Sequence, residues 1–342
     1  MADAKSGSKK EMEAVYQSGW GGREQLSVRT VPRPATKPGW VMVRVAAVSM
    51  HAGDHHMLTG RPYIIRAAVG RREIPGMDFA GFVVEDCSTD GKTLSAGDRV
   101  LGTSDVFCGA FAEFVCVPRA SVALIPDSVD FETAAAVPTS AMTALQALRV
   151  GRPTERGDRV LINGASGGVG TFAVQLAKAA GAHVTGVCSS RNVDLVRKVG
   201  ADDVIDYTKD GSYGLDRADK FDRIVDLVGN RTTSRWSRLM KPEGHMIAVS
   251  LGESELIVPF GLLRVALSNS YFSKKSFHLF HQEVSDADLD ALATMLGEGT
   301  LKPAIGRRSI GLPAIPDALS NFGHSSGKTV VRILDDAPSS SS

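Results

Sequence analysis

Paired cysteines are absent from this sequence. Its four cysteines, Cys87, Cys108, Cys116 and Cys188, are scattered, and no two of them form a C-x-x-C pair. Disulfide frameworks and structural zinc sites both depend on closely spaced thiols. We therefore expect a protein of a reducing compartment, in which the cysteines are free thiols.

Long apolar runs and an excess of one charge are missing as well. No stretch approaches the roughly 18 apolar residues of a membrane-spanning helix, and the opening MADAKSGSKKEM lacks the apolar core of a signal peptide. The formal net charge of +1 gives no field that would attract nucleic acid or anionic lipid. We expect a soluble, cytoplasmic protein without a membrane partner, and the charge disfavours a nucleic-acid partner.

Apolar residues are plentiful enough for two cores, since 43% of the 342 residues are hydrophobic and the chain exceeds the usual size of one domain. Up to about Phe131, short apolar runs such as WVMVRVAAVSM and GFVVED are broken by Gly, Pro and Asp, which is typical of β-strands. After Ala134, apolar strands alternate with helical stretches, and this alternation predicts a doubly wound parallel sheet.

Beyond Glu283 the pattern returns to that of the first part. The sequence predicts a helix in DADLDALATMLGEG, a strand in LKPAIGRRSI, a helix around AIPDALSNFG and a last strand in KTVVRIL. We therefore predict an α/β fold in which a β-rich domain, residues 1–133 and 284–342, is interrupted by a parallel-sheet domain, residues 134–283.

The strongest motif is the glycine-rich stretch RVLINGASGGVGTFAVQLAKAAG, residues 159–181. An apolar strand runs into the glycines and a helix follows directly, which is the context in which such a turn binds a dinucleotide pyrophosphate. The helix offers unpaired N–H groups and the positive end of its dipole to the anion. A purely structural glycine loop is the alternative. The predicted phosphate turn consists of Ser166, Gly167, Gly168, Val169 and Gly170.

The end of the next strand, HVTGV, indicates which dinucleotide is bound. NAD-binding sheets have a carboxylate about 20 residues after the glycines, where it binds the ribose hydroxyls. This chain instead has Cys188, Ser189, Ser190 and Arg191, and the nearest acid, Asp194, falls inside the next helix. Two hydroxyls and a guanidinium suit a 2′-phosphate, so we expect NADPH as the cofactor. An arginine that is merely solvated is the alternative.

Further motifs run from about residue 15 to 333, among them PGMDFAG, GDRVLG, GAFAEFVCVP, AAAVPTSAMTALQAL, GADDVIDY, LMKPEGHMIAV and GHSSGKTVV. Together with the glycine turn, they resemble the medium-chain dehydrogenase/reductase superfamily, and within it the zinc-free quinone oxidoreductase branch typified by zeta-crystallin. The resemblance implies a GroES-like β-rich domain, split between the two ends of the chain, around a central Rossmann domain. We also expect a homodimer.

The resemblance also assigns residues to the cofactor cleft. Tyr207 ends the third predicted strand and is a candidate for the wall beside the adenine, with a half-buried place in the sheet as the alternative. The aromatic segment 257–280 is a candidate for either the substrate pocket or a dimer edge. The residues implied by the family are Thr143, Ser250 and Leu251 beside the nicotinamide, Val228 beside the ribose, and Lys328 near the cleft between the domains.

Zinc-dependent members of the superfamily hold a catalytic metal with three side chains. The corresponding positions of this sequence carry His51, Met77 in PGMDFAG, and Thr139. Methionine and threonine are poor zinc ligands, and the closely spaced cysteines of the relatives' structural zinc loop are missing. We therefore expect no metal, and we keep an alcohol dehydrogenase with a histidine-built metal site as a competing hypothesis.

The segment HAGDHH, residues 51–56, places three histidines and an aspartate in six positions. The zinc-free branch usually has Asn-Pro-x-Asp here, followed by a tyrosine at the place of His56. We expect a loop in which His51, together with His56, lines the nicotinamide pocket as a polar orienter or proton donor. The alternative is a loop of solvent-facing histidines in which Asp54 bonds the backbone. His55 is expected to be a bystander.

The expected chemistry follows from the missing metal. Without a Lewis acid, alcohol oxidation lacks its usual activation, whereas reduction of an electrophilic acceptor needs less assistance. We expect NADPH to deliver a hydride to a quinone or to an α,β-unsaturated carbonyl compound, an enone. A third hypothesis is a non-catalytic protein, because some relatives of zeta-crystallin bind single-stranded RNA. The near-zero net charge counts against it.

Overall fold

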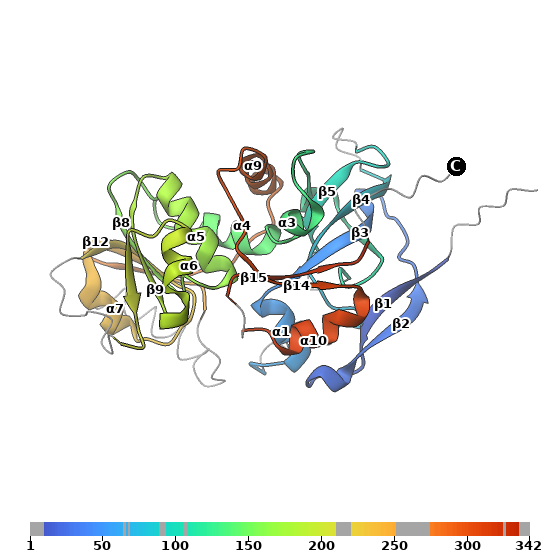
Figure 1. The fold of residues 1–342 in the computed structure, drawn as a ribbon, viewed down its shortest axis with the longest axis horizontal. Helices are drawn as coiled ribbons and strands as arrows, with labels where there is room; N and C mark the ends of the chain where they lie inside the picture. The colour runs from blue at the N-terminus through green and yellow to red at the C-terminus, as the bar shows by residue number, and fades with distance from the viewer. Residues whose placement is uncertain are drawn as a thin grey trace, which may run out of the picture.

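The computed structural model of the chain describes residues 10–63, 66–67, 69–88, 94–104, 109–209, 220–250, 274–323 and 326–334. It has two lobes that lie side by side, and each lobe is built around its own sheet (Figure 1). Among the described residues, no helix has both the length and the apolar character needed to cross a membrane.

A six-stranded sheet forms one lobe. Its strands are β8 (Arg159–Asn163), β9 (His183–Cys188), β10 (Asp203–Asp206), β11 (Phe221–Asp226), β12 (Met240–Ala248) and β13 (Ser276–Leu279). All neighbours pair in parallel, in the order β10-β9-β8-β11-β12-β13. The chain therefore reverses its direction across the sheet between β8 and β11, which is where doubly wound sheets form ligand crevices.

Within the described residues, helices connect β8 to β9, β9 to β10 and β11 to β12, as expected because a parallel crossover needs a dozen or more residues. Apolar residues at helical spacing in TFAVQLAKA give one of them a buried face made of Phe172, Ala173, Leu176 and their neighbours, which packs on the sheet. The helices of this lobe are α4 (Pro138–Ala147), α5 (Gly168–Ala179), α6 (Val193–Lys198) and α7 (Thr233–Leu239), with a short 3₁₀ turn, η4, at Ser190–Asn192.

A seven-stranded sheet forms the other lobe, in the order β14-β15-β3-β4-β5-β7, with β6 paired to β3. The C-terminal β15 pairs antiparallel with β3, so the end of the chain returns to the sheet of its first third (Figure 1). These strands are β3 (Trp40–Met50), β4 (Asp78–Asp86), β5 (Arg99–Thr103), β6 (Phe114–Pro118), β7 (Val122–Leu124), β14 (Ile305–Ile310) and β15 (Lys328–Arg332).

Smaller elements complete this lobe. A separate hairpin pairs β1 (Glu11–Gln17) with β2 (Leu26–Pro32). Short 3₁₀ turns lie at Arg23–Gln25 (η1), Arg119–Ser121 (η3) and Leu312–Ala314 (η5). The helices are α1 (Ala52–Thr59), α3 (Phe131–Ala135), α9 (Asp286–Gly297) and α10 (Ile315–Ser320), with α9 packed against both α4 and β7.

The predicted α/β fold, a GroES-like domain with a Rossmann-type parallel sheet, is confirmed by these two sheets. The helix, strand, helix and strand predicted after Glu283 are present as α9, β14, α10 and β15. The expectation of a loop at HAGDHH is wrong, because α1 begins immediately after His51. The division at residues 133/134 and 283/284 stays a prediction.

Candidate functional site

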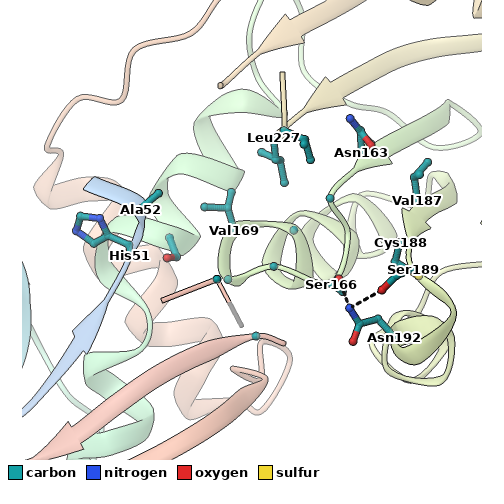
Figure 2. Close-up of a pocket in the computed structure, with 18 of the residues that line it drawn as sticks. His51, Ala52, Asn163, Ser166, Val169, Val187, Cys188, Ser189, Asn192 and Leu227 are labelled. Carbon is teal, nitrogen blue, oxygen red and sulfur yellow. Dashed lines mark hydrogen bonds between the residues drawn. The ribbon is translucent and has the colours of Figure 1, made fainter. Parts of the chain in front are cut away.

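A pocket of about 440 Å³ lies where residues of the two lobes meet. Its walls come from the ends of β8 and β9, the first turn of α5, the start of α1 and the segment before β15. Figure 2 shows its lining around the glycine-rich turn. The pocket therefore lies at the carboxyl edge of the parallel sheet, beside the point where the strand order reverses.

This pocket brings together most of the residues predicted from the sequence. His56, Thr143, Ser190, Ser250 and Lys328 are described but do not belong to its wall, and Leu251 lies outside the described residues. The predicted residues that do line it are His51, Ser166, Gly167, Gly168, Val169, Gly170, Ser189, Arg191, Tyr207 and Val228.

Two positions of the turn carry glycine for different physical reasons. A Cβ on Gly170 would lie on the carbonyl oxygen of Gly164 and 2.8 Å from the backbone of Ala165, so the tight packing of α5 on the turn requires glycine there. Gly167 has an ordinary backbone (φ −78°), and a Cβ on it would meet nothing closer than the Gly164 oxygen at 3.4 Å. Because protein packing does not explain this glycine, the open space beside it fits the close approach of a pyrophosphate to the start of α5.

The end of β9 presents one guanidinium and one hydroxyl to the pocket. Arg191 is exposed and lines the wall together with Ser189. The Ser190 hydroxyl, in contrast, donates to Asp206 at the end of β10, and this hydrogen bond lowers the pKa of Asp206. Ser190 therefore does not face the pocket as predicted. Cys188 is buried at the strand end, and burial raises its pKa to about 11, so it is a protonated thiol at neutral pH.

Three asparagines of the pocket were missed from the sequence. Asn192 follows Arg191, and its side chain donates to Ser166 Oγ (2.9 Å) and Ser189 Oγ (3.4 Å), as Figure 2 shows. Asn163, the last residue of β8, donates to Asp226 (2.8 Å) and to Asn230 (3.2 Å). The position of Asn163 directly before the glycine turn was the available signal. For Asn192, the partner Ser189 is three residues away, but Ser166 lies 26 residues away, and this pairing cannot be read from the sequence.

Asp226 organises the wall on the β11 side. It is 1% exposed and ends β11, and its Oδ1 accepts the backbone N–H groups of Val228 (3.1 Å) and Gly229 (3.0 Å). Its Oδ2 accepts the indole N–H of Trp236 at 2.9 Å. A buried carboxylate with several donors holds the loop that follows β11 in one conformation. Val228, 40% exposed, lines the pocket from this loop.

His51 lines the opposite end of the pocket and is the N-cap of α1. Its Nδ1 accepts the N–H of Gly53 (3.0 Å), and Asp54 Oδ2 accepts the backbone N–H of His51 in return (3.0 Å). A ring nitrogen that accepts cannot carry the proton, so the neutral ring is protonated at Nε2. That atom has no hydrogen-bond partner among the described residues, and Asp54 Oδ2 lies 3.5 Å from it.

The alternative interpretation of HAGDHH was a loop of solvent-facing histidines in which Asp54 bonds the backbone. It is correct for Asp54 and wrong for His51. Asp54 does bond the backbone, but His51 is only 8% exposed and does not face solvent. The His55 ring stacks on Phe322, with ring centroids 6.1 Å apart, and Phe322 lines the pocket. His55 therefore supports the wall from behind, whereas His56 contacts the His55 ring and does not reach the pocket.

Beneath the pocket, buried charges join the two lobes. Lys328, 1% exposed on β15, donates to Ser140 Oγ (2.9 Å) and Asp78 Oδ2 (3.4 Å), while Asp78 Oδ1 accepts the N–H of Thr139 on α4 (3.0 Å). Burial lowers the pKa of Lys328 and raises the pKa of nearby Asp54, and each of these shifts is opposed by the attraction between the two groups. The Lys328 stem also packs against Gly168, so the lysine supports the cofactor cleft from below.

These residues do not form a zinc site. His51 uses its Nδ1 lone pair for the helix cap, Met77 offers only a thioether, and the Thr139 hydroxyl is paired with Thr103 at 3.1 Å. Within the described parts of the chain, no group of three His, Cys, Asp or Glu side chains could hold a metal ion. The donor set therefore does not match the three-ligand, open-position geometry of catalytic zinc.

Two protein-family models match the chain. Residues 37–127 match the alcohol dehydrogenase GroES-like domain, and residues 168–291 match a family described as zinc-binding dehydrogenase.

Individual proteins match over nearly the whole chain. The trans-enoyl reductase pgmF of Aspergillus terreus (strain NIH 2624 / FGSC A1156) is 33% identical over 316 residues, covering 86% of this chain and 87% of the relative. The mitochondrial NAD(P)H oxidoreductase RTN4IP1 of Homo sapiens is 34% identical over 329 residues, covering 87% and 82%. The solved quinone oxidoreductase of Coxiella burnetii superposes with a TM-score of 0.82 at 26% identity, over 95% of this chain and 100% of that one.

Alanine substitutions at Gly167 and Gly170 form a matched pair of variants. Gly167→Ala fits the backbone and meets no close atom, so its melting temperature should stay within about 2 °C of the wild type, while the affinity for a pyridine dinucleotide falls by at least about 10-fold. Gly170→Ala forces α5 away from the turn and should destabilise the protein by about 1–3 kcal/mol.

Thermal unfolding and cofactor titration measure the two effects. A Gly167→Ala protein that binds the dinucleotide as tightly as the wild type would show that the open space beside Gly167 is not the phosphate site.

Proposed function

Because the chain belongs to the medium-chain dehydrogenase/reductase superfamily and is an oxidoreductase that uses a pyridine nucleotide, we propose that it is an NADPH-dependent, zinc-independent reductase of quinones or α,β-unsaturated carbonyl compounds. One observation carries the proposal. A single pocket contains a glycine-rich turn at the start of a helix and a guanidinium where NAD-binding sheets have an acid, and the part of the chain that the structure describes holds no group of metal-ligating side chains.

The preference for NADPH rests on the end of β9. No carboxylate follows Cys188 before the next helix, and the guanidinium of Arg191 and the hydroxyl of Ser189 line the pocket instead. The acid nearest to this corner, Asp206, accepts hydrogen bonds from Ser190 and Thr208. Arg191 would hold a 2′-phosphate with charge-assisted hydrogen bonds, while the first turn of α5 holds the pyrophosphate.

The reaction needs little more than positioning from the protein. When bound, NADPH supplies a hydride that an electrophilic acceptor can take up. The loop fixed by Asp226 and the helix start at Gly168 both line the pocket and would position cofactor and acceptor against each other. His51 would orient the acceptor oxygen by donating from Nε2, and the proton that completes the reduction comes from solvent.

Zinc independence is supported by the chemistry of the residues at the three ligand positions, His51, Met77 and Thr139. The relatives bear on the acceptor, because one is named a trans-enoyl reductase and one a quinone oxidoreductase. The homodimer and the cytoplasmic location stay predictions, and light scattering of the purified protein tests the first of them.

A panel of acceptors tests the reaction. The purified protein should oxidise NADPH in the presence of quinones or enones, both before and after dialysis against a chelator, and elemental analysis should find well under one zinc per chain. Alcohol oxidation with about one zinc per chain would favour the alcohol dehydrogenase hypothesis. Steeply salt-dependent RNA binding without NADPH oxidation would favour the RNA-binding hypothesis.

The guanidinium of Arg191 provides the test of cofactor choice. Arg191→Ala should raise the dissociation constant of NADPH by about 10- to 100-fold, because it removes charge-assisted hydrogen bonds to the 2′-phosphate, and should change that of NADH by less than about 3-fold. Arg197→Ala, an exposed arginine on α6, is the matched control and should change neither. A wild-type preference for NADH would contradict the proposal.

Two substitutions of His51 that both cap the helix can separate its proposed role in the reaction from its structural role. Asparagine and serine both cap helices well, but only asparagine keeps an N–H donor of comparable reach. His51→Asn should retain kcat within about 5-fold, whereas His51→Ser should lower kcat by about 100-fold at a similar melting temperature. Equal activity of the two variants, measured at saturating NADPH, would assign His51 to the cap alone.

A further inference from the structure

Asn192 lies at the centre of a hydrogen-bond network that the proposed reaction does not use. It is 8% exposed, ends the short turn η4 and lines the pocket between the glycine turn and the end of β9. Its Nδ2 donates to Ser166 Oγ (2.9 Å) and Ser189 Oγ (3.4 Å), the two bonds drawn in Figure 2. Its Oδ1 accepts the hydroxyl of Ser326. All three partners are serines, and they come from three different parts of the chain.

The direction of these hydrogen bonds determines whether the serine hydroxyls can still donate to a ligand. A hydroxyl has one proton to donate, and it can accept through its lone pairs. Ser166 and Ser189 both accept from Asn192, and within the described residues neither hydroxyl donates to an acceptor. Both therefore keep their proton for a ligand, and both line the pocket. Because phosphate oxygens only accept hydrogen bonds at neutral pH, two hydroxyls held in this way suit a phosphorylated ligand.

The bond from Ser326 fixes this polarity. Since Oδ1 of Asn192 accepts from Ser326, the amide cannot turn over without losing that bond, and its N–H groups stay on the side of Ser166 and Ser189. Ser326 belongs to the segment before β15, and the next residue, Gly327, donates its N–H to the carbonyl of Ser166 (2.8 Å). The lobe that contains β15 thus sets the direction of the donors at the proposed cofactor site.

We infer that Asn192 is a positioning residue that turns the hydroxyls of Ser166 and Ser189 toward the cofactor phosphates and thereby contributes to the selection of 2′-phosphorylated dinucleotides. The inference rests on the proposed NADPH site. Ser166 belongs to the proposed pyrophosphate turn, which both cofactors would use, whereas Ser189 stands near Arg191 at the end of β9, where NADPH would place a phosphate and NADH only a ribose hydroxyl. Loss of the Asn192 side chain should therefore weaken the binding of both cofactors through Ser166 and weaken the binding of NADPH further through Ser189.

The decisive variant is Asn192→Asp, which keeps the shape of the side chain and reverses its polarity. A carboxylate would accept from both serines, turn their protons away from the ligand and add a negative charge beside the phosphate. The dissociation constant of NADPH should rise by about 100-fold and that of NADH by about 10-fold, since each lost donor to an anion is worth roughly 10-fold in affinity. Titrations without an acceptor measure binding independently of turnover.

Two simpler ligands separate the two phosphate sites. Adenosine 2′,5′-bisphosphate carries the phosphate found only in NADPH, and adenosine 5′-monophosphate lacks it. Asn192→Asp should weaken the bisphosphate by about 10-fold more than the monophosphate. In a double-mutant cycle, Ser189→Ala and Asn192→Asp should couple for the bisphosphate and act additively for the monophosphate, because only the former ligand places a phosphate beside Ser189.

A separate variant tests the hydrogen bond from Ser326 to Asn192. Ser326→Ala leaves both pocket serines in place and removes only the hydroxyl that holds Oδ1 of Asn192, so it should lower the NADPH preference by about 3-fold with an unchanged melting temperature. Equal weakening of all ligands in Asn192→Asp, with the wild-type preference for NADPH intact, would overturn the positioning role and leave the proposed function standing. A wild type without preference for NADPH would overturn the cofactor proposal itself.

Discussion

The close contact between the start of α5 and the turn after β8 is the constraint on which the site depends. Gly170 lets the helix lie directly on the backbone of Gly164 and Ala165, so the first N–H groups of α5 end at the floor of the pocket. These groups have no partner within the helix, and they need an acceptor. An anion supplies one, and Gly167 leaves the space for it. The proposed cofactor site is therefore built around the start of this helix.

The same corner is also where the two lobes are joined. Gly327 donates to the carbonyl of Ser166, Ser326 donates to Asn192, and the stem of Lys328 packs against Gly168. Three consecutive residues before and at the start of β15 therefore contact the phosphate turn and its surroundings. A change in the relative position of the lobes would change the direction of the hydrogen-bond donors that face the pocket. The geometry of the site therefore depends on the contact between the lobes.

The parts of the fold and site that the sequence predicted depend on local patterns. The glycine turn, the helix that follows it and the arginine at the end of β9 lie within about thirty residues, and backbone geometry links each to its neighbours. The elements after Glu283 have clear apolar periodicity and were predicted with the correct type. Neither pattern requires knowledge of distant contacts.

The errors arise where distant contacts or an unusual residue decide the structure. HAGDHH forms a helix because His51 acts as a side-chain cap and Asp54 returns the bond, although histidine is not among the preferred capping residues. Ser190 turns away from the pocket because Asp206 on the next strand binds its hydroxyl. Asn192 owes its orientation to Ser326, which lies 134 residues further along the chain. Such pairings follow from the tertiary fold, and no local pattern predicts them.

Three buried charged side chains, Lys328, Asp78 and Asp54, lie beneath the pocket. A buried carboxylate is costly unless a cation or several donors accompany it. Lys328 lies 3.4 Å from Asp78 Oδ2, and the attraction between Lys328 and Asp54 opposes the rise that burial causes in the pKa of Asp54. The same oxygen of Asp78, Oδ2, also accepts from the Ser49 hydroxyl, and its other oxygen, Oδ1, accepts the N–H of Thr139. A lysine on β15 thus accompanies the buried carboxylates beneath the pocket. Two of the three positions that carry zinc ligands in the relatives are tied to this cluster, since Thr139 donates to Asp78 and His51 exchanges its capping bond with Asp54, so their polar groups hold the protein together and support the proposed zinc-independent reduction.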